Sequence, residues 1–249
     1  MILNINKPLG ITSYDVIRKL KKDYPGEKIG HAGTLDPLAQ GVLICLVGKD
    51  ATRRQSEFMG QPKQYVFDVL FGFKTDTYDV LGLPEFTPYN YEEIKAQLPE
   101  ILKKYLGEID QEVPSFSAVK MDGQTLYRST LSGEKKENPV RKVLIEDIRI
   151  LEEYTVSKDS LQKSILDLLG LVRSGFRQNR IIEAWNQLFD HISQDKFLIV
   201  KISADVSKGT YIRAIAHDLG RDLKIGACTT IITRTKVGDF KIEEARSLA

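Results

Sequence analysis

The sequence predicts an α+β fold, in which helices pack against a sheet, and three patterns support this prediction. Residues 63–73 (KQYVFDVLFGF) place a large apolar side chain at every second position, the period of a half-buried strand. Residues 41–48 (GVLICLVG) form a continuous apolar run of strand length. Residues 157–195 instead repeat apolar side chains at helical spacing. Strands and helices therefore share a chain of 249 residues, which is long enough to bury a sizeable core.

The remaining elements follow in chain order. Strands are predicted at 2–5, 41–48, 63–73, 141–151, 197–204 and 230–240, and the apolar face of 63–73 consists of Tyr65, Phe67, Val69, Phe71 and Phe73. A helix over 12–24 begins with Thr12 or Ser13 as its N-cap. Helices are also expected over 211–223 and over 91–105, where Pro99 predicts a kink or two shorter helices.

A single domain is expected over residues 1–249, with residues 157–195 inserted in it as a helical hairpin. The chain has no Pro-, Gly- or Ser-rich linker and no internal repeat. Each helix of the hairpin carries one apolar stripe, formed by Leu161, Ile165, Leu168, Leu169 and Val172 and then by Ile181, Trp185, Leu188, Phe189 and Ile192. Residues 173–180 (RSGFRQNR) would form the basic tip between them.

The net charge of +2 is spread unevenly along the chain. Basic residues exceed acidic ones by four in residues 1–75 and by four in residues 196–249, whereas acidic residues are in excess by six in between. If the two ends meet in space, they form a positive surface that can hold a polyanion. An ordinary mixed and solvated surface is the alternative.

The sequence lacks the signals that mark several other classes of protein. No apolar run approaches the ~20 residues of a membrane helix and no secretory signal is visible, so a cytoplasmic protein is expected. Cys45 and Cys228 show no CxxC spacing, which favours buried, reduced thiols. Phosphate-loop, dinucleotide, nucleophile-elbow and HExxH motifs are absent, and the three histidines lack metal-ligand spacing. The predicted chemistry uses neither a cofactor nor a metal.

Asp36 is the candidate catalytic residue, as the one carboxylate in the turn-prone segment KIGHAGTLDPLAQG. Pro37 favours an extended conformation at Asp36, and the glycines of the segment allow sharp turns around it. The segment runs into the buried strand at 41–48, which is a rigid mount for a nucleophile or a general base. On these residues alone, a carboxylate that only caps a turn is the alternative.

Motifs along most of the chain resemble those of the bacterial tRNA pseudouridine synthase B (TruB) family. They are INKPLGITSYDV, GHAGTLDPLAQGVLICLVGKDATR, KQYVFDVLFGFKTDTYDVLG, VPSFSAVKMDGQTLY, RKVLIEDIRI, SKGTYIRAIAHDLG and TRTKVGDFKIEEA, in that order. The resemblance implies the pseudouridine synthase fold, a mixed and largely antiparallel sheet with flanking helices. It also implies an isomerase that converts uridine to pseudouridine at position 55 in the T-loop of tRNA, acting as a monomer on the T-arm.

The same resemblance implies the site residues. Asp36 is the essential catalytic residue, either as a nucleophile or as a base that takes a proton from the ribose. The target base is flipped out, and the substrate-binding residues are His31 in the vacated space, Tyr65 and Tyr211 beside the base, Arg213 paired with Asp36, and Lys7 supporting the pocket or a backbone phosphate. An extended chain at 211–213 would point its tyrosine and arginine to one side. A loop histidine, a core tyrosine, a surface arginine and a solvated lysine are the structural alternatives.

Two other functions are weighed against this one. A non-catalytic tRNA-binding or folding module with the same fold is disfavoured by the presence of Asp36 and Arg213, and an aspartate-nucleophile hydrolase by the absence of a phosphate loop or metal cluster. The chain also departs from the family pattern, because it ends at Ala249 without the usual small C-terminal RNA-binding (PUA-like) domain. The insert either binds RNA through Arg173, Arg177 and Arg180 or is a solvated hairpin tip.

Overall fold

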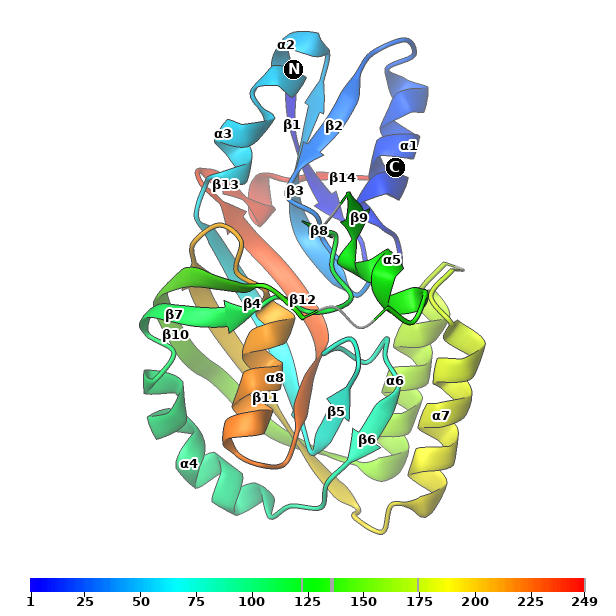
Figure 1. The fold of residues 1–249 in the computed structure, drawn as a ribbon, viewed down its shortest axis with the longest axis vertical. Helices are drawn as coiled ribbons and strands as arrows, with labels where there is room; N and C mark the ends of the chain where they lie inside the picture. The colour runs from blue at the N-terminus through cyan, green and yellow to red at the C-terminus, as the bar shows by residue number, and fades with distance from the viewer. Residues whose placement is uncertain (122, 135–136, 174, 249) are drawn as a thin grey trace.

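One large sheet, two short hairpins and helices on both faces of the sheet make up the structure (Figure 1). The computed structural model describes residues 1–121, 123–134, 137–173 and 175–248. The strands are β1 (Ile2–Lys7), β2 (Ile29–Ala32), β3 (Ala39–Val47), β4 (Lys63–Phe71), β5 (Phe73–Thr75), β6 (Pro84–Phe86), β7 (Gly107–Glu112), β8 (Lys120–Met121), β9 (Gln124–Thr125), β10 (Val140–Ser157), β11 (Lys196–Val206), β12 (Ala227–Val237), β13 (Phe240–Lys241) and β14 (Arg246–Ser247). The helices are α1 (Ser13–Asp23), α2 (Lys49–Arg53), α3 (Gln55–Met59), α4 (Tyr91–Lys103), α5 (Leu126–Leu131), α6 (Lys158–Leu171), α7 (Gln178–His191) and α8 (Ile212–Asp222), with a 3-10 turn η1 (Ile242–Glu244).

The large sheet is mixed and mostly antiparallel. Its main path is β14-β1-β3-β12-β4-β11-β10-β7, and β2 and β13 pair with β3 and β12 outside that path. The pairings β1–β14 and β3–β12 are parallel, whereas the others described for this sheet are antiparallel. The two ends of the chain meet in this sheet, because β12 lies between β3 and β4 and β14 pairs with β1. The two basic end segments are therefore neighbours in space.

Strand β4 separates two cores, and the glycine at its end corrects one prediction. Its alternating face from Tyr65 to Phe71 packs with residues of α4 and α8, whereas Leu70 belongs to the core beneath α6 and α7. Phe73 does not share the face of Tyr65. Gly72, with φ of 88°, ends β4 in a conformation that favours glycine, and Phe73 packs in the second core at 5.2 Å from the Trp185 ring.

Helices α1 and α4 bear on two predictions, the N-cap at the start of α1 and the effect of Pro99 within α4. Thr12 is the N-cap of α1, and its side chain and that of Asp15 form a reciprocal capping box. The two shorter helices considered around Pro99 are not observed, because α4 runs through it as one helix. Leu98 and Leu102 are buried beside the proline, and this packing retains the helix although the proline removes one hydrogen bond.

The segment 157–195 folds as two helices, α6 and α7, that cover the lower part of the sheet in Figure 1. Most of the two predicted apolar stripes is buried in one core with residues of β4, β5 and β11. The indole N–H of Trp185 donates to Val80 O at 3.0 Å and ties α7 to the body. Over the described ranges, no helix is long and apolar enough to cross a membrane.

Candidate active site

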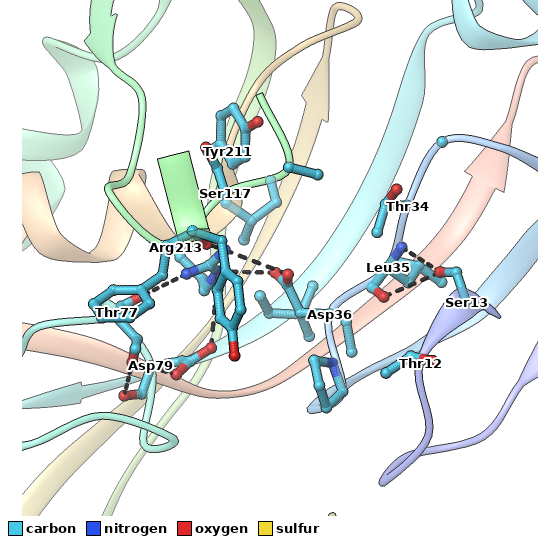
Figure 2. Close-up of a pocket in the computed structure, with 18 of the residues that line it drawn as sticks. Thr12, Ser13, Thr34, Leu35, Asp36, Thr77, Asp79, Ser117, Tyr211 and Arg213 are labelled. Atoms are coloured by element: carbon cyan, nitrogen blue, oxygen red, sulfur yellow. Dashed lines mark hydrogen bonds and ion pairs between the residues drawn. The ribbon is translucent and has the colours of Figure 1, made fainter. Parts of the chain in front are cut away.

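Asp36 lies in the loop between β2 and β3, and contacts on both sides hold this loop (Figure 2). Ser13 Oγ, at the start of α1, accepts from Leu35 N at 2.8 Å and donates to Leu35 O at 3.1 Å. On the other side, Gly10 N donates to Pro37 O at 2.8 Å. The Asp36 side chain is 37% exposed. The loop thus presents one accessible carboxylate from a fixed backbone.

Arg213 faces Asp36 from α8, and oxygen acceptors surround its guanidinium (Figure 2). Nε donates to Asp36 Oδ2 at 2.8 Å, and Nη2 donates to Asp36 Oδ1 at 3.3 Å. Nη1 donates to Thr77 O, and Nη2 donates to Phe116 O at 3.1 Å. This bidentate contact fixes the orientation of the carboxylate, and the 4% exposure of Arg213 excludes a surface arginine.

The extended geometry considered for residues 211–213 is not observed. Tyr211 is the N-cap of α8 and Arg213 lies in its first turn, yet both side chains line the same cavity. A cation is unfavourable at a helix N-terminus, and burial also disfavours its charge. The carboxylates of Asp36 and Asp79 outweigh the burial and raise the pKa of Arg213 above its usual range.

Asp79 is a second carboxylate on Arg213, which residue patterns did not single out. Its Oδ2 lies 3.8 Å from Arg213 Nε, while Oδ1 accepts from Thr77 Oγ1 at 2.6 Å and Leu81 N at 3.0 Å. Burial raises the pKa of Asp79 to about 6, although Arg213 opposes this shift. The Asp79 side chain is therefore enclosed, whereas that of Asp36 is accessible.

A cavity of about 570 Å³ opens over the Asp36–Arg213 pair. This volume lies in the range of small-molecule sites and suits a nucleoside. Four of the five predicted substrate-binding residues line it, namely His31, Tyr65, Tyr211 and Arg213. The structure thus brings segments from both ends of the chain into one site.

The lining residues differ in how they are held. Tyr65 is buried in the face of β4 and lines the cavity, and its hydroxyl accepts from Arg234 Nη1 at 3.5 Å. Burial, followed by the charge of Arg234, lowers the pKa of His31. Tyr211 is fixed through its backbone, because its N–H donates to Gln111 Oε1 at 2.7 Å and its carbonyl accepts from Gln111 Nε2 at 3.1 Å.

Arg234 is another lining residue that the sequence reading missed. It is 1% exposed, and it donates to Val42 O at 2.7 Å and Gly33 O at 3.0 Å. It thereby joins β12 to the loop that leads to Asp36. The sequence does contain a pattern that predicts burial of Arg234. It follows Ile232 by two positions, and in a half-buried strand this spacing places both side chains on the same inward face.

Lys7 is not available to an RNA phosphate in this structure. Its side chain is 0% exposed, does not line the cavity, and donates from Nζ to Ile11 O at 2.6 Å and Pro8 O at 3.0 Å. The solvated alternative is excluded for the same reason. Of the two roles considered for Lys7, the phosphate contact is therefore wrong and support of the pocket fits the structure. Lys7 holds the carbonyls of the segment before α1, and α1 in turn holds the Asp36 loop through Ser13.

Lys7 makes the stability of the protein depend on pH. Burial lowers the pKa of Lys7 from 10.5 to about 7, although Asp36 opposes the shift. Between these values the unfolded chain binds a proton on Lys7 that the folded chain has lost, so its contribution to stability rises with pH. We expect the free energy of unfolding of wild type to rise relative to Lys7→Met between pH 7 and 9.5, in urea titrations. Parallel pH profiles would contradict this.

No group of three His, Cys, Asp or Glu side chains that could hold a metal ion is found in the part of the chain that the structure describes. The lining has instead the Asp36–Arg213 ion pair, three further cationic side chains and aromatic rings. Such a set can orient a polar, ring-shaped substrate and perform nucleophilic or acid–base chemistry on it.

Comparisons with known proteins place this chain in a family. A model of the N-terminal domain of TruB family pseudouridylate synthases matches residues 19–163. The tRNA pseudouridine synthase B of Fusobacterium nucleatum is 38% identical over 242 residues, which cover 97% of this chain and 69% of that protein. The protein of the same name from Bacteroides fragilis is 36% identical over 254 residues, covering 98% of this chain and 88% of that protein.

Solved structures agree on the fold. A chain of a Cbf5–Nop10–Gar1 complex matches with a TM-score of 0.61 at 25% identity, covering 99% of this chain and 52% of that chain. A chain of an H/ACA RNP bound to a substrate RNA containing 2′-deoxyuridine matches with a TM-score of 0.58 at 23% identity, covering 99% and 50%. This chain spans about half the length of those chains. The predicted pseudouridine synthase fold is confirmed, and the chain belongs to the TruB family of pseudouridylate synthases, which makes it an isomerase.

Proposed function

We propose that this protein converts uridine to pseudouridine at position 55 in the T-loop of tRNA, with Asp36 as the essential catalytic residue. The observation that carries the proposal is the accessible carboxylate of Asp36, held bidentately by the buried Arg213 at the floor of a nucleoside-sized cavity. The relatives named tRNA pseudouridine synthase B support tRNA as the substrate.

The reaction is an isomerisation that rearranges bonds within one nucleotide. The bond from ribose C1′ to uracil N1 breaks, the base turns, and a bond from C1′ to C5 forms. N1 gains a proton and C5 loses one, so no atom or electron is supplied from outside. Asp36 acts either by adding to the substrate as a nucleophile or by taking a proton from the ribose. Arg213 holds the carboxylate in position for either step.

The cavity also suits a base taken out of its stack. Unstacking costs a few kcal/mol, which aromatic contacts in the enzyme offset. Tyr65 and Tyr211 lie beside the space over Asp36 and would contact the flipped uracil, whereas His31 would fill the gap in the RNA.

Charge favours an RNA ligand at this cavity. Lys63, Arg213 and Arg234 line it against Asp36 and Asp79, whereas Arg177, which also lines it, is paired with Asp76. Burial, with Arg234 and Lys208 nearby, lowers the pKa of Lys63 to about 8, so at neutral pH its cationic form prevails. Binding to the T-arm follows from this proposal, and a monomer in the cytoplasm remains a prediction.

Mapping of pseudouridine in a defined transcript tests the function. We expect the purified protein to convert uridine 55 of an unmodified tRNA and of an isolated T-arm hairpin, and to leave a transcript with cytidine at that position unmodified. A protein that binds these RNAs without forming pseudouridine would instead be the non-catalytic module.

Two variants in the same assay test the stacking roles. Tyr65→Phe keeps the ring, so RNA affinity should be retained and any loss should appear in the single-turnover rate. His31→Ala should slow the reaction of the folded T-arm more than that of an unstructured oligonucleotide, because only the former leaves a gap to fill. Unchanged rates in both cases would remove these residues from the site.

A further inference from the structure

The described tip of the helical insert, residues 173 and 175–180, reaches the candidate active site. The guanidinium of Arg177, just before α7, lies 4.6 Å from the centre of the Phe116 ring, and its Nη1 donates to Asp76 Oδ2 at 3.0 Å. Arg177 and Phe176 line the same cavity as Asp36. The guanidinium of Arg177 is therefore occupied on the protein body, which speaks against the RNA contact that was one of the two alternatives for this arginine.

The two groups that Arg177 contacts belong to the segments that hold Arg213. Asp76 precedes Thr77, whose carbonyl accepts from Arg213 Nη1, and the carbonyl of Phe116 itself accepts from Arg213 Nη2. These two segments supply the backbone acceptors described for the Arg213 guanidinium. Arg177 thus joins the two segments that orient Arg213 towards Asp36.

The surrounding contacts restrict both segments and the arginine that joins them. Asp76 Oδ1 accepts from Leu83 N at 2.8 Å, so the second oxygen of this carboxylate is also engaged. The Phe116 ring packs edge-on against Tyr127 at 5.9 Å, and Tyr127 packs against Phe176 of the insert at 6.4 Å. The insert therefore contacts Phe116 in two ways, directly through the guanidinium of Arg177 and indirectly through Phe176, which packs on Tyr127.

The backbone of Arg177 adopts a conformation that is unusual for a residue other than glycine. Its φ of 58° is left-handed, a conformation that costs a non-glycine residue free energy and that is retained only where surrounding contacts determine it. Gln178 Nε2 donates to Val172 O across the turn, and Ile181 N donates to Arg177 O at 3.1 Å. These bonds fix the direction in which the arginine leaves the insert.

The insert also contacts Gly10, which lies between β1 and α1 and is itself bonded to the loop of Asp36. Arg173 N donates to Gly10 O at 3.1 Å, and Gly10 N donates to Pro37 O, next to Asp36. A Cβ atom at Gly10 would overlap the Leu171 carbonyl at the end of α6, so this approach requires glycine. Both partners of the Asp36–Arg213 pair are therefore backed by the same hairpin.

We infer that Arg177 is a positioning residue for the Asp36–Arg213 pair and that the helical insert completes the active site rather than serving only as surface. This inference rests on the proposed function of Asp36. Arg177 acts through the Thr77 and Phe116 carbonyls and touches no reacting atom. Its removal therefore lowers the rate of isomerisation at saturating enzyme and leaves tRNA affinity nearly unchanged.

The test compares single-turnover rates and tRNA dissociation constants of wild type and Arg177→Gln. We expect the rate to fall about tenfold, since small misplacements of catalytic groups have effects of up to about 100-fold, and affinity to stay within about twofold. Arg177→Lys should recover part of the rate, because the ammonium can still pair with Asp76. Asp76→Asn should also slow the reaction, and the double variant should be no slower than Arg177→Gln, because both changes break one contact.

Two matched controls separate positioning from other effects. Lys163→Gln removes the same charge from an exposed site on α6 and should change neither quantity. Phe189→Leu loosens the buried far half of α7 and should lower the melting temperature without lowering the rate at the assay temperature. If Arg177→Gln weakened tRNA binding at an unchanged saturating rate, the tip would be an RNA contact and the inference would be wrong.

Failure of this inference is distinguishable from failure of the proposed function. An Arg177→Gln enzyme as fast as wild type, beside an inactive Asp36→Asn, would overturn the inference alone. Pseudouridine formation by Asp36→Asn would overturn the function on which it rests.

Discussion

Asp36→Asn should abolish pseudouridine formation while tRNA affinity stays within about tenfold of wild type. The amide has the shape of the carboxylate, but it can neither add to the substrate as a nucleophile nor take its proton. The variant can still accept a hydrogen bond from Arg213 through its oxygen, so the cavity should keep its form. Single-turnover assays with excess enzyme, together with filter binding, measure the two quantities.

The control for this variant lies in the same structure. Asp68 is a carboxylate of β4 outside the cavity, so Asp68→Asn should leave the rate unaffected. Residual activity of Asp36→Asn that survives removal of any deamidated protein would disprove the role of Asp36 as the essential group.

Arg213→Lys should lower turnover by roughly 100-fold, the effect expected when a catalytic group is displaced by about 1 Å. The lysine retains a positive charge near Asp36 and Asp79. It loses the planar fork that contacts both oxygens of Asp36 and two backbone carbonyls at once. Asp36 would then be free to rotate, and the loss should appear in kcat more than in tRNA affinity.

The melting temperature of Arg213→Lys should be measured together with its rate, because Arg213 is buried and its replacement also affects stability. Its replacement leaves buried carbonyls without a donor, so the melting temperature should fall as well. Rates measured below the transition of the variant separate the two effects. Equal rates for Arg213→Lys and wild type at such a temperature would show that charge alone, without geometry, supports the reaction.

Local patterns predicted those parts of the fold that depend on neighbouring residues. The capping of α1 by Thr12 and the helical stripes of α6 and α7 follow from short-range rules. The end of β4 was misjudged, because the apolar alternation continues through Phe73 and periodicity does not register the positive φ of Gly72. The behaviour of Pro99 was ambiguous because burial of Leu98 and Leu102, which retains the helix, is a tertiary property.

The site was predictable to the extent that motifs mark it. The turn-prone segment around Asp36 indicated a fixed carboxylate, but only resemblance supplied its pairing with Arg213, which comes from the other end of the chain. Asp79, the carbonyls of Thr77 and Phe116, and the contacts of Arg177 with the protein body escaped prediction for one reason. Their contribution lies in a position relative to Arg213 that no spacing along the sequence encodes, and backbone acceptors have no residue signature at all.

The position of β12 constrains how the molecule is made. This strand, residues 227–237, hydrogen-bonds to both β3 and β4, which come from the first third of the chain. During synthesis the two early strands emerge long before the strand that joins them, with unpaired backbone groups along the edges that face each other. The nascent protein thus carries open strand edges until residues 227–237 have been synthesised, a state prone to pairing with other chains. Assembly of the catalytic centre waits for the same event, because Arg234 arrives on that last central strand.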